Sequence, residues 1–425
     1  MKIDISRDSF STLHDYTRVL LQQGRPILDA DWNEQTAIVL HQLRSVTRAI
    51  YGAHGGPAGG QCGFIPFVAD NELGFSNGYY TVDGLHLVCG ADPTDANQPR
   101  CTYTHQKYCT QKDLATGTYL IYLEAMEREV TPAENPDLLD TALLGVDSGA
   151  RGQAIWRILA EDWTESVSKF PPNTFCRDVM EKVNAEWLPE KIKRFASVTV
   201  PELDPHKPSG FPNQFFRYEC HSVDSKSIWK YSGDNGFALF KMKAPVRPQQ
   251  NKLSISIGTL RSWLPKKGDW VELLTEEQIR FGMPGVLCEI DEVRGNQEQT
   301  MDAIDRFDVH LKSPIPAGTA GEYLRVWNGR IESDVVDGIK PADYWQFAVR
   351  DTKPDGVTLR RPPRSYVPLG LVRTNPDKSI CIISRFQHIA LVPWREVDEE
   401  LDCPKVAQPE NASPPLAGAK PATQS

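Results

Sequence analysis

The sequence predicts an α+β protein that is mainly β, with an N-terminal αα-hairpin followed by antiparallel β-sandwich or barrel-like domains. Two observations predict this class. Apolar side chains recur at helical spacing within the first 53 residues. Beyond residue 60 the period changes, and short β-rich runs alternate with turn residues.

The first helix of the hairpin is expected to start after residue 12 and to end near residue 23. Leu13, Tyr16 and Leu20 recur at helical spacing there. Gly24 then supplies a residue that tolerates a left-handed helix end, and Pro26 cannot continue the helix.

The second helix is expected to begin at Asp31, which can cap it with Glu34 at the third helical position. It should run to Gly52 and carry one apolar stripe. The stripe consists of Trp32, Val39, Leu43, Val46 and Ile50. Because both helices need to bury apolar side chains, we interpret residues 1–53 as a docking element.

A first β-rich domain is expected at residues 61–170, after a glycine-rich hinge at 54–60. Residues 78–88 predict a β-hairpin, and residues 118–126 predict a central, buried strand. Residues 171–212 are interpreted as a mixed insertion or connection, with a short helix around 177–187.

One or more further β-rich domains are expected at residues 213–400, forming a sandwich or a partly open barrel. The expected strands are 215–219, 227–230, 237–240, 253–257, 269–273, 285–290, 307–311 and 323–327. Residues 403–425 are rich in Pro, Ala, Ser and Lys and are expected to be a disordered tail.

Composition limits the function. With 425 residues the chain is long enough for several domains, and its net charge of −9 argues against broad nucleic-acid or anionic-membrane binding. No apolar run reaches the length of a membrane span, so direct transmembrane insertion is not expected. Asp4 and Asp8 stand where a secretory signal would have an apolar core. The nine scattered cysteines fit reduced thiols in a reducing compartment better than a disulfide framework. We expect a cytoplasmic protein that is assembled into a particle and released by lysis.

The acidic residues of the N-terminal region suggest two chemistries. Asp29, Asp31 and Glu34 could be metal or acid/base carboxylates, but the chain enters a helix where a Ca²⁺ loop would need further ligands. Helix capping is therefore the favoured interpretation. Arg18 and Arg25 are expected to pair with these carboxylates.

Metal and catalytic signals are sparse. Cys101, His105 and Cys109 have metal-like spacing, but the paired Cys-x2-Cys knuckle of most zinc sites is missing, so no metal and no cofactor are expected. Neither a nucleophile elbow nor a phosphate-binding loop occurs. A glycosidase pair among Glu124, Glu127 and Glu129 is a minor alternative to ion-paired residues at a strand end.

The N-terminus resembles the opening of a family of uncharacterised proteins encoded beside phage-tail-like contractile injection systems. Residues 1–10 and 22–34 carry this resemblance. Its signature positions are Arg18, Gln22, Gln23, Gly24, Arg25, Asp29, Asp31, Trp32 and Glu34.

Later segments extend the resemblance to about residue 390. They are residues 127–131, 143–156, 213–219, 229–236, 343–350 and 366–373. Two positions depart from the family pattern. Met126 stands where the family usually has Trp, and Arg364 with Ser365 replaces a double His, so no role of that pair can be carried over.

The resemblance implies a structural or adaptor subunit at the baseplate or spike end of an injection particle, without a known catalytic activity. Its expected partners are baseplate or spike subunits, and a homo-oligomer such as a trimer fits a spike axis. The alternative is a carbohydrate-binding or depolymerising surface protein. A cytoplasmic toxin would need a catalytic constellation that the sequence does not offer.

Overall fold

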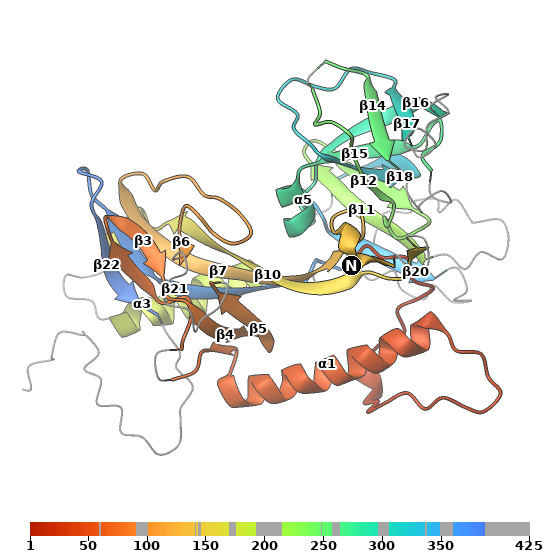
Figure 1. The fold of residues 1–425 in the computed structure, drawn as a ribbon. Helices are drawn as coiled ribbons and strands as arrows, with labels where there is room; N and C mark the ends of the chain where they lie inside the picture. Colours follow the sequence, from red (N-terminus) through yellow and green to blue (C-terminus); the bar gives the residue numbers. More distant parts are fainter. Residues whose placement is uncertain are drawn as a thin grey trace, which may run out of the picture. The chain divides into compact units, whose positions relative to one another are not determined.

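Figure 1 shows the fold in a computed structural model. It describes residues 1–58, 61–90, 101–140, 142, 146–169, 176–192, 215–247, 249–256, 264–295, 306–335, 338–348 and 360–386. The expected fold class is confirmed, because most elements in this part of the chain are strands of antiparallel sheets.

The first large sheet is built around β7 (Gly117–Val130), which pairs along its length with β10 (Arg151–Asp162). On its other side β7 pairs with β21 (Arg364–Thr374), which pairs in turn with β22 (Ile380–Arg385). Leu120, Ile121 and Leu123 of β7 are fully buried. The expected central, buried strand is therefore confirmed, and its second neighbour comes from a distant part of the sequence.

Smaller sheets pack on this core. The expected hairpin at 78–88 is confirmed as β4 and β5, and Phe64 meets Trp156 edge to face with ring centroids 4.8 Å apart. The strands of these sheets are β1 (His54–Gly55), β2 (Pro66–Ala69), β3 (Glu72–Phe75), β4 (Gly78–Val82), β5 (Leu85–Cys89) and β6 (Cys101–Thr102). β8 (Leu139–Asp140) and β9 (Val146–Asp147) form a separate two-stranded sheet.

The later strands form a four-stranded and a six-stranded sheet. The first has the order β19 (Gly329–Ser333), β12 (Ser227–Ser232), β11 (Phe215–Val223) and β20 (Tyr344–Ala348). The second has the order β13 (Leu239–Lys241), β18 (Tyr323–Trp327), β15 (Trp270–Leu274), β16 (Val286–Gly295), β17 (Arg306–Leu311) and β14 (Lys252–Ser256). An antiparallel bridge between Met242 and Ile255 joins the two edges of the six-stranded sheet, so this sheet curls into a barrel. All eight strands expected between residues 215 and 327 are present.

Helices are few and short apart from α1. The helix expected around residues 177–187 is confirmed as α3 (Cys176–Lys182), a π-helical segment at Val183–Trp187, and α4 (Leu188–Ile192). The other short helices are η1 (Thr12–His14), η2 (Pro136–Leu138), α2 (Thr164–Ser168) and α5 (Glu276–Phe281). α5 was not predicted, although Thr275 and Gln278 form a capping box at its start.

Several expectations remain untested. Residues 171–175 and 193–212 of the expected insertion, and the tail at 403–425, lie outside the described residues. The domain boundaries stay a prediction. None of the helices in the described ranges combines the length and apolar character that a membrane span needs.

The prediction of the first helix of the hairpin is wrong. Only the 3₁₀ turn Thr12–His14 forms, and residues 15–28 contain no helix. Leu13 and Leu20 are 87% and 69% exposed, so no tertiary packing stabilises a helix here. Gly24 does adopt the left-handed conformation, at φ +71°, but within a turn closed by the Arg25 N–H donating to the Gln22 carbonyl.

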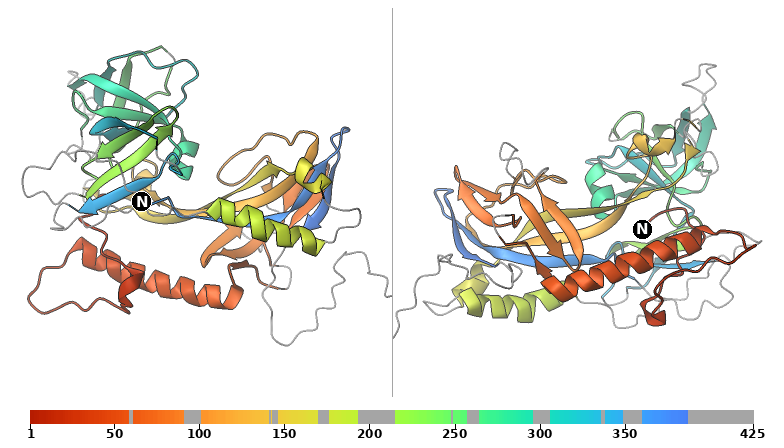
Figure 2. Two further views of the ribbon diagram at one scale, coloured as in Figure 1. Left: turned by 180° about the vertical axis from the view of Figure 1, so that it is seen from behind. Right: turned by 60° about the horizontal axis from the view of Figure 1, so that its bottom comes forward.

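The second helix is present as α1 (Asp29–Tyr51), and it begins three residues earlier than expected (Figure 2). The N-cap is Leu28, which makes no side-chain capping bond, so the capping role expected for Asp31 is wrong. Asp29 and Asp31 instead lie in the first turn, where carboxylates favour the helix dipole. The end is as expected, since Gly52 is the C-cap at φ +76°.

Candidate interaction site

Helix α1 turns its apolar side outward. We call Trp32, Val39, Leu43, Val46 and Ile50 the outer face. These side chains are 66%, 51%, 60%, 58% and 68% exposed, whereas the buried residues of α1 are Ala30 and Ile38. An ordinary surface helix buries its apolar stripe and exposes its polar side, so α1 has the inverse arrangement.

Polar contacts hold the opposite side of α1 to the rest of the chain. The Arg44 guanidinium donates to Glu127 of β7 at 2.9 Å, and Arg48 Nε lies 3.0 Å from Asp83 in the β4–β5 turn. At the start of the helix, the backbone N–H and hydroxyl of Ser6 donate to Asp29 at 2.8 and 2.7 Å. These contacts orient α1 with its outer face away from β7.

Gly84 permits the close approach of α1 to the β4–β5 turn. It has φ +79°, and a Cβ at this position would lie 2.6 Å from the carbonyl oxygen of Arg44. A side chain would therefore meet the backbone of the helix as well as disfavour the left-handed conformation. The turn and the helix fit together only with glycine here.

The segment before α1 lies along the flank of the helix. Ser9 donates to Glu34 at 2.6 Å, the N–H of Val19 donates to Gln35 at 2.8 Å, and the Phe10 ring contacts His41. The same segment carries further exposed apolar side chains: Leu13, Tyr16, Leu20, Leu21 and Ile27. The exposed apolar surface is thus larger than the outer face alone.

The signature residues lie partly in the segment before α1 and partly on α1 itself. Gln22, Gln23, Gly24 and Arg25 form the turn of the flanking segment, while Asp29, Asp31, Trp32 and Glu34 lie on α1. Among the described residues, Asp29 and Glu34 are bound by Ser6 and Ser9 and not by Arg18 or Arg25. The expected arginine pairing is therefore absent from this part of the chain.

A hollow of about 850 Å³ opens beside the start of α1. Ile3, Asp4, Asp29, Trp32, Arg151 and Phe237 contribute to its lining. Burial, together with the charges of Asp234, Asp29 and Asp147, raises the pKa of Asp4 above its ordinary value. Because Trp32 belongs to both, the hollow continues the outer face.

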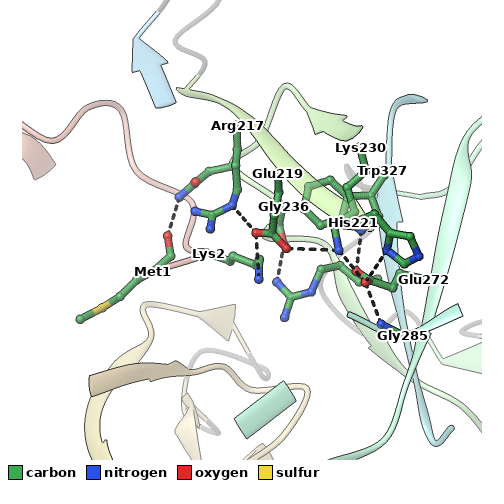
Figure 3. A network of polar contacts seen from close by, with 12 residues as sticks. Met1, Lys2, Arg217, Glu219, His221, Lys230, Gly236, Glu272, Gly285 and Trp327 are labelled. Atoms are coloured by element: carbon green, nitrogen blue, oxygen red, sulfur yellow. Dashed lines mark hydrogen bonds and ion pairs between the residues drawn. The ribbon is translucent and has the colours of Figure 1, made fainter. Parts of the chain in front are cut away.

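Buried charges hold the residues that precede α1 (Figure 3). Lys2 Nζ lies 3.1 Å from Glu219 of β11, which also accepts from Arg217 Nε at 2.8 Å and lies 3.1 Å from Lys230 Nζ. Asn235 donates to the carbonyl oxygens of Met1 and Ile3 at 3.1 and 2.9 Å. The N-terminal segment is thereby fixed to the four-stranded sheet.

A second buried carboxylate completes the network. Glu272 of β15 accepts from Lys230 Nζ at 2.5 Å, from Trp327 Nε1 at 3.0 Å and from the Gly285 N–H at 3.0 Å. Burial alone would raise the pKa of Glu272, but Lys230 and His221 hold it well below its ordinary range. Lys230 thus connects the four-stranded sheet to the barrel.

The pKa values of the buried network reflect its ion pairs. Burial would raise the pKa of Glu219, but Lys2, Lys230 and Arg217 hold it below its ordinary range. Burial lowers the pKa of Lys2 to about 8, although Glu219 opposes this. A general acid needs a raised carboxyl pKa, and neither Glu219 nor Glu272 has one.

The three glutamates of the glycosidase alternative are dispersed among ion pairs. Glu124 is bound by Arg157, by Arg364 at 2.6 Å and by the Tyr366 hydroxyl at 3.2 Å. Burial would raise its pKa, but Arg364 and Arg157 lower it. Burial would also raise the pKa of Glu129. The positive charges of the Met1 amino group, Lys2 and Arg325 outweigh this effect and lower the pKa to about 2.

The candidate metal ligands do not converge. Cys101 and Cys109 are buried, and His105 Nδ1 instead contacts the Thr104 hydroxyl at 2.9 Å. Cys101 lies in β6, and His105 forms an isolated bridge with Thr110, so the three residues are not on one helical face. No group of three or more His, Cys, Asp or Glu residues placed to hold a metal ion occurs among the described residues.

Sequence reasoning missed the buried charge network. A signal existed, because Lys230 stands between Trp229 and Tyr231 in a β-rich run and Glu219 follows the aromatic residues of β11. Charged residues inside apolar strands require partners. The sequence could not show that Lys2 and Glu272 supply them.

Comparison with known proteins gives little further information. Residues 1–170 match the model of a family described as a family of unknown function, DUF6519. The comparison with curated proteins finds no match. A solved structure titled "Crystal structure of TssK" is 10% identical over 74% of this chain and 99% of that chain. Its TM-score of 0.18 does not define a shared fold.

Proposed function

We propose that this chain is a non-enzymatic structural or adaptor subunit of a phage-tail-like contractile injection particle, at its baseplate or spike end. The observation that carries the proposal is the inverse arrangement of α1. The five apolar side chains of the outer face are exposed while the polar side of that helix is bound to the chain itself. Exposed apolar patches of this kind mark surfaces that are buried on assembly.

Two further features support an assembly role. The resemblance to proteins encoded beside injection systems includes residues 1–10 and 22–34, which belong to α1 and the segment before it. Glu219 holds Lys2 at the start of that segment, and Arg44 and Arg48 hold α1, so the interaction surface is presented on a fixed support. A partner then loses little conformational entropy in α1 on binding.

Incorporation into particles tests the proposal. Leu43→Glu places a charge in the middle of the outer face, and we expect it to reduce the amount of this chain that co-sediments with particles from the producing cells. Ser45→Glu is the matched control, because Ser45 is exposed on the same helix but outside the outer face. Equal incorporation of both variants would refute the proposed docking role.

Point substitutions are preferable to deleting residues 1–52. Such a deletion would also remove Lys2, which lies against the buried Glu219, and would destabilise β11 for a reason unrelated to docking. Circular dichroism of the purified Leu43→Glu and Ser45→Glu variants should show the same melting temperature as the unmodified chain. Any loss of incorporation is then attributable to the surface.

A further inference from the structure

The five residues of the outer face of α1 follow a heptad repeat, and the exposed Leu40 lies beside it. Val39, Leu43, Val46 and Ile50 are separated by four, three and four residues, and Trp32 lies seven residues before Val39. In heptad notation, Trp32, Val39 and Val46 occupy d positions, Leu43 and Ile50 occupy a positions, and the a position between Trp32 and Val39 is the polar Thr36. This 3.5-residue period is that of a helix seam that packs against another helix.

The positions that flank this seam carry no charge between Trp32 and Ile50. The e and g positions are Asn33, Gln35, Leu40, Gln42, Thr47 and Ala49. Coiled coils usually select a foreign partner through charged e and g residues. An uncharged flank selects no complementary charge pattern, and two identical seams can meet without like-charge repulsion.

Three charged residues of α1 lie outside these positions and are bound to the chain itself. Arg44 and Arg48, at b and f positions, contact Glu127 and Asp83, and Glu34, at an f position, accepts from Ser9. These contacts leave the seam available, because they anchor the b and f side of the helix to its own chain. Two copies would therefore present the same uncharged surface to each other.

We propose that the outer face of α1 packs against the outer face of a second copy of this chain, as a short parallel coiled coil. The proposal rests on the proposed function in that both assign an assembly role to this face. It goes further because it names the partner. In a parallel pair each a and d residue meets its own counterpart, so Val46 lies next to Val46 of the partner copy.

Sedimentation of the purified full chain tests the self-association. We expect a concentration-dependent species heavier than the 47.7 kDa monomer. Leu43→Glu should weaken the association at least about tenfold, because it places two carboxylates at one a layer, whereas Ser45→Glu should leave it unchanged. A chain that stays monomeric at about 100 μM would overturn the proposal, as would an oligomer that Leu43→Glu leaves intact.

Cysteine cross-linking tests the register. In a Cys381→Ser background, which removes an exposed thiol, Val46→Cys should form an intermolecular disulfide on mild oxidation. Ser45→Cys, one position outside the seam, should not. Cross-linking of Ser45→Cys but not of Val46→Cys would overturn the parallel seam.

These results are separable from those for the proposed function. If the purified chain is monomeric but Leu43→Glu still abolishes incorporation into particles, self-association is refuted and docking onto another subunit stands. If the chain associates through α1 but both variants enter particles equally, self-association stands and the docking role of this face is refuted.

Discussion

Replacing Lys230 with methionine tests the buried charge network most directly. Lys230 is 1% exposed and lies between two buried carboxylates, at 3.1 Å from Glu219 and 2.5 Å from Glu272. Methionine preserves the length of the side chain and removes its charge. Glu219 keeps Lys2 and Arg217, but Glu272 keeps only neutral donors and the more distant His221, 3.6 Å away, among its described contacts.

The expected loss of stability is large for a single substitution. Removing one partner of a buried ion pair costs about 3 to 5 kcal/mol, because the remaining charge stays buried without compensation. At an m-value of about 2 kcal/mol/M, this lowers the urea midpoint by roughly 1.5 to 2.5 M. The cation also lies 4.6 Å from the centre of the Trp327 ring, so its removal changes the surroundings of a buried indole.

Urea unfolding followed by tryptophan fluorescence measures the loss. The control is Lys252→Met, which removes a partly exposed partner of Asp308 and should cost no more than about 1 kcal/mol. Adding Glu272→Gln to Lys230→Met should restore part of the stability, since the uncompensated charge is then absent. A Lys230→Met chain no less stable than the control would refute the assignment of this network as a determinant of stability.

Three further predictions follow. Gly84→Ala should destabilise the chain by about 1 to 3 kcal/mol. Gly268→Ala is the control, because Gly268 also has a positive φ but open space around it, and it should destabilise the chain less. The urea midpoints of the two variants measure the difference. The stability contributed by Glu129, whose pKa is about 2 instead of 4.5, should be fully present above pH 4.5 and be lost as the pH falls toward 2; Glu129→Gln should flatten this part of the pH profile. Iodoacetamide should label the exposed Cys381 in the native protein but not Cys220 or Cys288, because burial raises the pKa of these thiols to about 12 and 11; labelling of all three at equal rates would contradict the burial.

Local sequence patterns predicted the strands well and the first helix poorly. β7 was predicted because its apolar run could be satisfied only by burial on both faces. Two apolar clusters provide that burial, one around Ile121 and Leu123 and the other around Leu120 and Tyr122, while β10 and β21 pair with its edges. The segment with Leu13, Tyr16 and Leu20 has an equally clear helical period. It finds no surface to pack on, so a short amphipathic pattern alone does not fold.

The interaction surface and the charge network differ in what the sequence could show. The stripe from Trp32 to Ile50 was visible as a pattern, but the pattern implied burial within the chain or against a partner without distinguishing them. The structure shows that the stripe is exposed because Arg44 and Arg48 bind the other side of α1. The contact between Lys2 and Glu219 joins residues more than two hundred positions apart, which no local pattern encodes.

The magnitude of the exposed surface bears on the kind of partner. Fully burying one such side chain contributes about 1.5 to 3 kcal/mol, so five side chains that are half to two-thirds exposed offer roughly 5 to 8 kcal/mol per copy. Bringing two molecules together costs about 4 to 15 kcal/mol in lost freedom. The outer face alone therefore supports only modest affinity for a free partner. It becomes effective when several copies or additional contacts share that cost, which is the situation of a subunit within a particle.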